Sequence, residues 1–309
     1  MLIRIFILSL FLTVGFFAKA QQDEHFSQYR FNKVLFNPAF AGSKNFITSN
    51  IFYRYQWIDF EGSPVTQSMS IQGPMRNKKI GLGLHIINDQ VGVLGKTSIS
   101  SSYAYHVRTK IGNFGLGIQA GAIQARILGS KLRITDSNDP TIPLVNQTTW
   151  LPDAGFGFFY RIRTFYIAAS TLHLIEKDVN YTTAAQTSIG RLRKHFYFSS
   201  GYNVEFSPEL AMYISALAKY TEPAPLVVDV NMSFLIHNTF WFGFAYRSKD
   251  AGVFNFGYHF NERFKFGYAF DFTISSLAAY NKGTHEVMLS YDLVKIKFPK
   301  FRKNKEEEE

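Results

Sequence analysis

The chain has 309 residues, of which 32 are Phe, 17 are Tyr and none is Cys, and it carries a formal net charge of +10 at pH 7. The lack of cysteine excludes disulfides, thiolate metal sites, cysteine nucleophiles and a lipoprotein anchor. The basic residues are scattered over turns and loops and form no stripe, which argues against a nucleic-acid partner.

Residues 1–20 predict a cleaved secretory signal peptide. Arg4 precedes a continuous apolar run over residues 5–17, and small residues at 18 and 20 form a cleavage site. We expect cleavage after Ala20. No later stretch approaches the roughly twenty apolar residues that a spanning helix needs. The mature chain is therefore expected to be either a soluble secreted protein or a membrane β-barrel.

Residues 21–45 predict a short periplasmic segment that docks on or in the rest of the protein. The segment is too apolar for a free tail and is interrupted at Asn37 and Pro38. Such a segment is a natural plug or partner surface. The candidate residues for this role are His25, Phe26, Ser27, Gln28, Asn37, Pro38 and Gly42.

From residue 46 onward the sequence alternates with a period of two, which indicates β-strands. In residues 264–272 every even position is Phe or Tyr, whereas the odd positions are Lys, Gly, Ala and Asp. Residues 240–247 and 253–260 repeat this pattern. One large apolar face and one small or charged face favour a transmembrane barrel with a polar lumen over a soluble sandwich.

The breaks in this pattern predict an all-β fold, a transmembrane antiparallel β-barrel of about fourteen strands over residues 46–298. The expected strands lie at residues 46–57, 65–73, 79–88, 97–108, 111–123, 154–162, 164–173, 195–205, 208–219, 226–236, 239–248, 252–261, 263–273 and 284–296. Long connections at residues 124–153 and 174–194, and shorter ones at 88–96 and 275–283, are expected to point outward. Breaks after even-numbered strands are tight, as is typical of outer-membrane proteins. A charged periplasmic tail is expected at residues 299–309.

Several charged or polar residues are expected to face the lumen. These lumen-facing candidates are Arg54, Gln56, Arg247, Lys265 and Asp271. Isolated charges of both signs favour internal pairing over a conducting channel.

No pattern indicates catalysis. The eight histidines lack metal-ligand spacing, and no Gly-x-Ser-x-Gly elbow is present. A lipid hydrolase, the enzyme class found among outer-membrane barrels, is therefore not expected. We predict no catalytic residue, no cofactor and no metal ion.

Three short blocks near the mature N-terminus resemble a known family: HFSQY at 25–29, NPAFAG at 37–42 and YRYQW at 53–57. Weaker agreement comes from GLG at 81–83, from the stretch over 88–92 and from GTHE at 283–286. Together these blocks resemble the PorP/SprF family of type IX secretion system outer-membrane proteins from Bacteroidetes.

The resemblance implies a non-enzymatic accessory barrel of the type IX secretion and gliding motility machinery in the outer membrane. It implies help with the export or surface attachment of cargo, such as adhesins with a C-terminal sorting domain. The implied partners are this cargo, peptidoglycan-linked periplasmic components and outer-membrane lipid. Both a core secretion role and an anchor for one adhesin remain open. The alternative is a passive outer-membrane pore or hydrophobic-solute channel.

Overall fold

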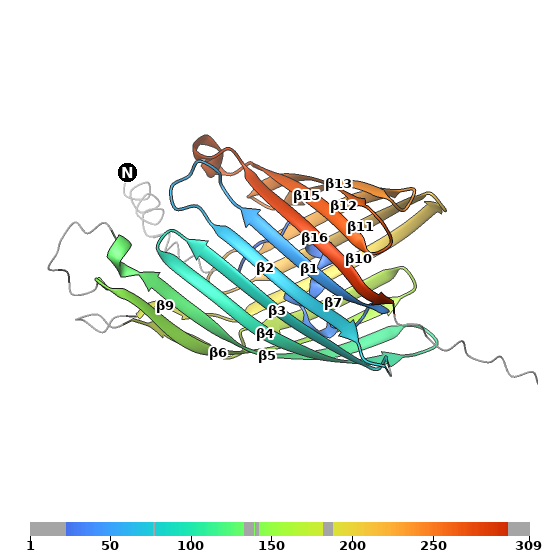
Figure 1. The fold of residues 1–309 in the computed structure, drawn as a ribbon, viewed down its shortest axis with the longest axis horizontal. Coiled ribbons are helices and arrows are strands. Elements are labelled where there is room, and N and C mark those ends of the chain that lie inside the picture. Colours follow the sequence, from blue (N-terminus) through green and yellow to red (C-terminus); the bar gives the residue numbers. More distant parts are fainter. Residues whose placement is uncertain (1–22, 77, 133–138, 140–141, 182–187, 296–309) are drawn as a thin grey trace, which may run out of the picture.

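The structure is a computed structural model that describes residues 23–76, 78–132, 139, 142–181 and 188–295 (Figure 1). Fourteen strands form a closed barrel in which every neighbouring pair is antiparallel. Among the described residues, no helix is both long and apolar enough to cross a lipid bilayer. The predicted signal peptide and charged tail lie outside the described residues.

The strands follow one another around the barrel in chain order. The barrel strands are β1 (Phe46–Tyr55), β2 (Val65–Pro74), β3 (Ile80–Val91), β4 (Leu94–Arg108), β5 (Asn113–Leu128), β6 (Asn146–Ile162), β7 (Phe165–Leu172), β10 (His195–Ser207), β11 (Leu210–Tyr220), β12 (Val227–Ile236), β13 (Phe240–Arg247), β14 (Ala251–His259), β15 (Phe264–Thr273) and β16 (Thr284–Lys295). Outside the barrel, β8 (Lys177–Asn180) and β9 (Ser188–Leu192) pair as a hairpin. The 3-10 helices of the described residues are η1 (Tyr29–Phe31), η2 (Lys33–Leu35), η3 (Pro38–Phe40), η4 (Gly129–Lys131) and η5 (Ser276–Tyr280).

The barrel closes because the first and last strands pair. β1 runs antiparallel to β16, with Phe46 opposite Lys295 and Tyr55 opposite His285. Closure leaves no free sheet edge, which is the condition for a strand-built protein in a bilayer. The all-β barrel of fourteen strands predicted from the alternation is confirmed.

The two faces of the wall differ as the alternation predicts. Phe198, Phe244 and Phe272 are exposed on the outside of the barrel, whereas Asn50 and Ser215 are buried toward the lumen. In β15, Phe and Tyr side chains point outward while Gly267, Ala269 and Asp271 are buried. An apolar outside and a polar inside is the arrangement that a membrane barrel requires.

The connections at the two ends of the barrel differ in length. At one end, here called the short-turn end, residues 163–164 join β6 to β7 and residues 208–209 join β10 to β11. The opposite end, here called the long-loop end, carries the connections at 129–145 and 173–194, the second of which contains the β8–β9 hairpin.

Two of the loop predictions need correction. Residues 88–96 were expected to form a loop, but β3 and β4 continue through them as a hairpin that turns at Gly92 and Val93. Cross-strand pairing, including a 2.9 Å hydrogen bond from the Thr97 hydroxyl to the Asn88 side chain, stabilises this extension. The loop predicted over 124–153 is likewise shortened, because β5 and β6 pair from Leu128 and Asn146 inward.

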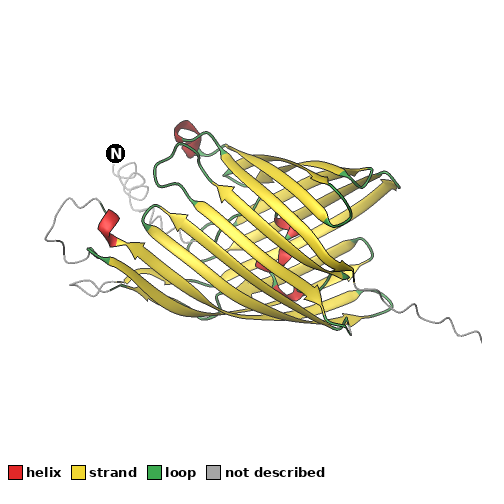
Figure 2. Ribbon diagram, in the orientation of Figure 1, coloured by secondary structure: helices red, strands yellow, loops and turns green. Residues whose placement is uncertain are grey.

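The N-terminal segment fills the lumen. Figure 2 shows its short helical turns inside the ring of strands. Phe26, Tyr29, Leu35 and Phe36 pack with wall side chains in one buried apolar cluster. The docked segment predicted for the fold is therefore an internal plug, which we define as residues 23–42. Cleavage after Ala20 and the domain boundaries at residues 45 and 298 stay predictions.

Candidate functional site

The plug runs through the barrel from the long-loop end to the short-turn end. Asp23 contacts Lys96 at the start of β4 and His173 just after β7, both at the long-loop end. Gly42 lies against Gly73 and Gly81 near the short-turn end, where β1 begins. Residues 21–45 were expected on the periplasmic side, but the described part of this segment spans the lumen from one end to the other.

Local sequence explains the bend at Asn37 and Pro38. The side chain of Asn37 accepts a 2.9 Å hydrogen bond from the backbone N–H of Ala39, and Pro38 occupies the first position of η3. A side-chain cap followed by proline is a favourable way to begin a helical turn. The Asn37 amide also donates to the carbonyl oxygens of Phe158 and Ala169, each at 3.0 Å. Asn37 therefore shapes the plug and attaches it to two wall strands.

Glycines in the wall give the plug room at three points. A Cβ atom added to Gly157 would lie 2.2 Å from Asn37 Oδ1, one on Gly117 would lie 2.2 Å from the Ala39 nitrogen, and one on Gly81 would lie 1.9 Å from the Ala41 oxygen. Such distances are far shorter than van der Waals contact. These inward glycines let the backbone of the plug approach the sheet closely.

An ion-pair network holds the first turn of the plug. Glu286 accepts hydrogen bonds from the backbone N–H groups of Ser27 and Gln28, each at 2.8 Å. Arg54 lies 2.6 Å from Asp271 and 3.1 Å from Glu286, and it also donates to the Ser27 hydroxyl at 2.9 Å. All five side chains are buried. Mutual pairing offsets the large cost of burying these charges.

Arg247 on β13 extends this network along the inner face of the wall. Its guanidinium lies 2.7 Å from Asp229 and 3.1 Å from Asp271. Lys219 in turn lies 2.8 Å from Asp229 and 2.8 Å from the ring of His25. The charged side chains of this network, which lie in the half of the lumen near the long-loop end, are thus paired.

The structure brings together most of the residues singled out from the sequence, whose roles stay predictions. Arg54, Arg247 and Asp271 share one network, and His25, Ser27 and Gln28 join it from the plug. Phe26 packs on Phe52 with ring centroids 5.6 Å apart. Lys265 pairs separately with Asp292 at 2.9 Å, and Gln56 lies beyond the end of β1, where its backbone N–H bonds to Pro64.

Sequence reasoning missed three wall residues of this network: Glu286, Asp229 and Lys219. Each lies two residues from a buried residue on the same strand and so shares its face, as Glu286 does with Met288 and Ser290. The alternation alone therefore carried the signal that these charges face inward.

A second cluster, here called the mouth cluster, consists of Asp23, Lys96, Asp153, His173 and Tyr197 at the long-loop end. The Asp23 carboxylate lies 2.9 Å from His173, 3.0 Å from Lys96 and 2.9 Å from the Tyr197 hydroxyl. The other ring nitrogen of His173 lies 2.9 Å from Asp153. These contacts attach the start of the plug to three strands or their ends.

The charges of the mouth cluster support one another. Burial opposes the charged form of His173, but Asp23 and Asp153 raise the pKa of His173 to about 10. Burial also opposes ionisation of Asp23, yet His173, His195 and Lys96 hold the pKa of Asp23 well below its usual range. Both groups are therefore charged at neutral pH.

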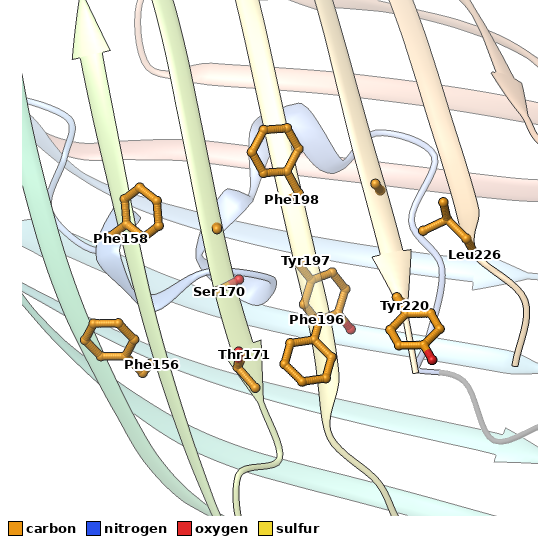
Figure 3. A pocket seen from close by; sticks show the side chains of 11 residues that line it. Phe156, Phe158, Ser170, Thr171, Phe196, Tyr197, Phe198, Tyr220 and Leu226 are labelled. Atoms are coloured by element: carbon orange, nitrogen blue, oxygen red, sulfur yellow. The ribbon is translucent and has the colours of Figure 1, made fainter. Parts of the chain in front are cut away.

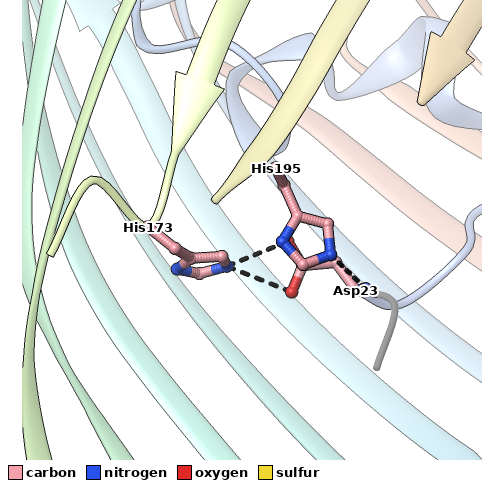
Figure 4. Close-up of side chains that lie close together, drawn as sticks. All are labelled: Asp23, His173 and His195. Atoms are coloured by element: carbon pink, nitrogen blue, oxygen red, sulfur yellow. Dashed lines mark hydrogen bonds and ion pairs between the residues drawn. The ribbon is translucent and has the colours of Figure 1, made fainter. Parts of the chain in front are cut away.

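Asp23, His173 and His195 also have the composition of a metal site. Figure 4 shows the two rings meeting at Asp23, and one ligand atom from each residue lies within 4.8 Å of the others. Both ring nitrogens of His173 bond to carboxylates, so the ring is protonated and has no free lone pair. Lys96 already neutralises Asp23. The arrangement fits an ion-pair cluster better than a metal centre.

A cavity of about 300 Å³ lies beside the mouth cluster. The β8–β9 hairpin contributes residues such as Val179 and Gly190 to its lining, and the wall contributes Lys96 and Arg126. Tyr181 adds an aromatic surface. This mouth cavity combines charges of both signs with apolar area, a composition suited to a polypeptide partner.

An apolar groove of about 370 Å³ lies on the wall across β6, β7, β10 and β11. Figure 3 shows Phe156 and Phe158 on one side of Ser170 and Thr171, and Phe196 and Phe198 on the other. The exposed Phe156, Phe196 and Phe198 side chains belong to the outer face of the barrel. The groove is therefore separate from the lumen.

A family model described as "Type IX secretion system membrane protein PorP/SprF" matches residues 18–291. No curated protein matches the chain.

Solved outer-membrane barrels share the fold. A "CymD monoaromatic hydrocarbon channel" is 14% identical, with 86% of this chain and 91% of that chain covered and a TM-score of 0.50. A Pseudomonas aeruginosa FadL homologue is 10% identical, with 87% and 94% covered and a TM-score of 0.50. At these identities the likeness concerns the fold alone.

Proposed function

Because the chain belongs to the PorP/SprF family of type IX secretion system membrane proteins, we propose that it is a non-enzymatic outer-membrane barrel that assists the export or surface attachment of cargo proteins such as adhesins. The cargo would carry a C-terminal sorting domain, and peptidoglycan-linked periplasmic components of the secretion and gliding machinery would be further partners. Outer-membrane lipid would contact the apolar groove that contains Phe156 and Phe198.

The observation that carries this proposal is the filled lumen. The plug is attached at the long-loop end by Asp23, in the middle by Asn37 and near the short-turn end by Ala41, whose carbonyl accepts a 2.7 Å hydrogen bond from His106. A barrel filled in this way offers its two ends, not its axis, to other molecules. The mouth cavity is the surface that we assign to cargo, since outer-membrane barrels carry their long loops on the outside of the cell.

A channel is the second candidate function, because the fold of this chain resembles that of a solved hydrocarbon channel. Paired charges such as Arg247 with Asp229 and Asp271 fill the lumen instead of lining an open path. Steady conductance of the purified protein in planar lipid bilayers would favour the channel. We expect the intact barrel to show no steady open state.

Deleting the gene tests the proposed function. We expect loss of at least one sorting-domain cargo from the cell surface, together with impaired gliding where that cargo is an adhesin. Arg126→Glu reverses a charge in the mouth cavity, so complementation with this variant should restore the barrel in the membrane but not the cargo on the cell surface. Arg108→Glu, at the opposite end of the barrel, should restore both. Unchanged secretion and gliding in the deletion strain would refute the proposal.

A further inference from the structure

The short-turn end contains a second, larger cavity of about 550 Å³, which we call the basic vestibule. Its lining includes Arg30 and Lys33 from the plug, Arg161 from β6, and Tyr166 and Tyr213 from β7 and β11. Arg163 adds a fourth cation in the turn after β6, and Glu205 is the one carboxylate among the described lining residues. The cavity is therefore strongly cationic.

Aromatic rings, not carboxylates, hold these cations. Lys33 Nζ lies 3.6 Å from the ring centroid of Tyr166 and donates a 2.8 Å hydrogen bond to the Tyr213 hydroxyl. The Arg30 guanidinium lies 4.4 Å from the ring centroid of Phe31, and its buried Nε has no hydrogen-bond partner among the described residues. Cation–π contacts fix the position of a cation without neutralising it.

The contrast with the other half of the lumen is the main reason to infer a ligand. Arg54 and Arg247 each pair with two buried carboxylates. In the part of the chain that the structure describes, no carboxylate forms an ion pair with Arg30, Lys33 or Arg161. Unpaired half-buried cations repel one another and cost stability, so a site that retains three of them is suited to an incoming anion.

We propose that the basic vestibule binds an acidic segment of a partner polypeptide that enters from the short-turn end. The cations lie on two sides of the cavity, on the plug and on the wall, and therefore match several carboxylates along one chain. Phe31, Leu235 and Tyr213 add apolar and aromatic surface to the same lining, which suits a peptide better than a small inorganic anion. In outer-membrane barrels this end faces the periplasm.

The inference goes beyond the proposed function, because it concerns the end opposite to the mouth cavity. Binding to purified protein also tests it without any secretion assay. The probe is a fluorescein-labelled peptide of alternating Glu and Gly, compared with the Gln and Gly peptide of equal length, by fluorescence anisotropy with the full mature chain in detergent.

We expect the Glu peptide to bind at least about tenfold more tightly than the Gln peptide, the effect of hydrogen bonds to charged groups. Arg161→Gln should weaken binding about tenfold. Arg161→Lys should retain most of the affinity for the Glu peptide. Lys33→Gln, which removes a cation of the plug, should also weaken binding. Arg108→Gln is the matched control, because Arg108 is exposed at the end of β4 and lies outside the lining of the vestibule.

A difference in migration between unheated and heated samples on a detergent gel shows that each variant still folds. The measurement is repeated with the chain ending at Lys305, because Glu306–Glu309, which lie outside the described residues, are themselves acidic and could compete. Tighter peptide binding by the shortened chain would support a carboxylate site. Equal binding of the two peptides, equal losses in Arg108→Gln and Arg161→Gln, or displacement by inorganic phosphate as effective as by unlabelled peptide would each overturn the proposal.

Discussion

The hydroxyl of Ser27 donates a 2.7 Å hydrogen bond to the carboxylate of Asp271, although 244 residues separate the two along the chain. Both side chains are buried, and Arg54 contacts each of them. The Arg54 side chain on β1 thus connects the plug with β15. The plug is consequently part of the folded barrel and not a separate element that rests against it.

Replacing Arg54 with Met is expected to destabilise the barrel by about 3–5 kcal/mol, the usual effect of removing one partner from a buried ion pair. The substitution leaves Asp271 and Glu286 close together in the lumen, with Arg247 alone to compensate Asp271. Thermal unfolding in detergent measures the effect. Arg108→Met removes an exposed cation at the short-turn end of β4, away from the network, and should unfold close to the wild-type temperature. Similar unfolding temperatures of both variants would show that the network does not stabilise the barrel.

The strands were predictable because a single rule governs them. Alternation of large apolar and small or polar residues located all fourteen barrel strands, and it placed Arg54, Arg247 and Asp271 on the inner face. The predicted loop at residues 88–96 was wrong because cross-strand pairing, which depends on a partner strand, extended the hairpin to Gly92. Alternation describes one strand at a time and carries no information about such partners.

The path of the plug was less predictable. The composition predicted that residues 21–45 dock, and Asn37 and Pro38 indicated an interruption in the segment. Nothing local indicates that Asp23 pairs with His173, because the contact joins residues 150 positions apart. The basic vestibule was hidden for the same reason, since Lys33 and Arg161 meet only when the barrel closes around the plug.

Gly81→Ala is expected to disturb the plug near the short-turn end. The new Cβ would lie 1.9 Å from the Ala41 carbonyl oxygen, so the backbone of the plug must move, at a cost of about 1–3 kcal/mol. Hydrogen–deuterium exchange over residues 37–42 should become faster. Gly252→Ala is the matched control, because nothing lies within 4 Å of the added Cβ, and it should leave the exchange unchanged. Slow exchange in both variants would contradict the close packing of the plug on β3.

The mouth cluster should make stability depend on pH. The pKa of His173 is raised from 6.5 to about 10, so its stabilising contribution is fully present below pH 6.5 and is lost as the pH rises toward 10. The pKa of Asp23 is lowered, so its contribution is present above its ordinary value of 3.8 and is lost only as the pH falls below that value. Thermal unfolding of wild type and His173→Gln should therefore differ most between about pH 4 and 6.5 and converge toward pH 10. A difference that does not change between pH 6 and pH 10 would contradict a charged His173.

A disulfide can test whether the plug must move during function, because the chain has no cysteine of its own. The Cβ of Ala41 lies 3.4 Å from the position of a Cβ on Gly83, close to the roughly 3.5–4.5 Å that a disulfide requires. The double variant Ala41→Cys, Gly83→Cys should therefore cross-link in an oxidising compartment, and the two single variants serve as controls. If cargo binds the mouth cavity while the plug stays in place, the cross-linked protein should support cargo surface display at wild-type level. Loss of display that a reductant restores would instead show that the plug leaves the lumen, which would favour passage along the barrel axis.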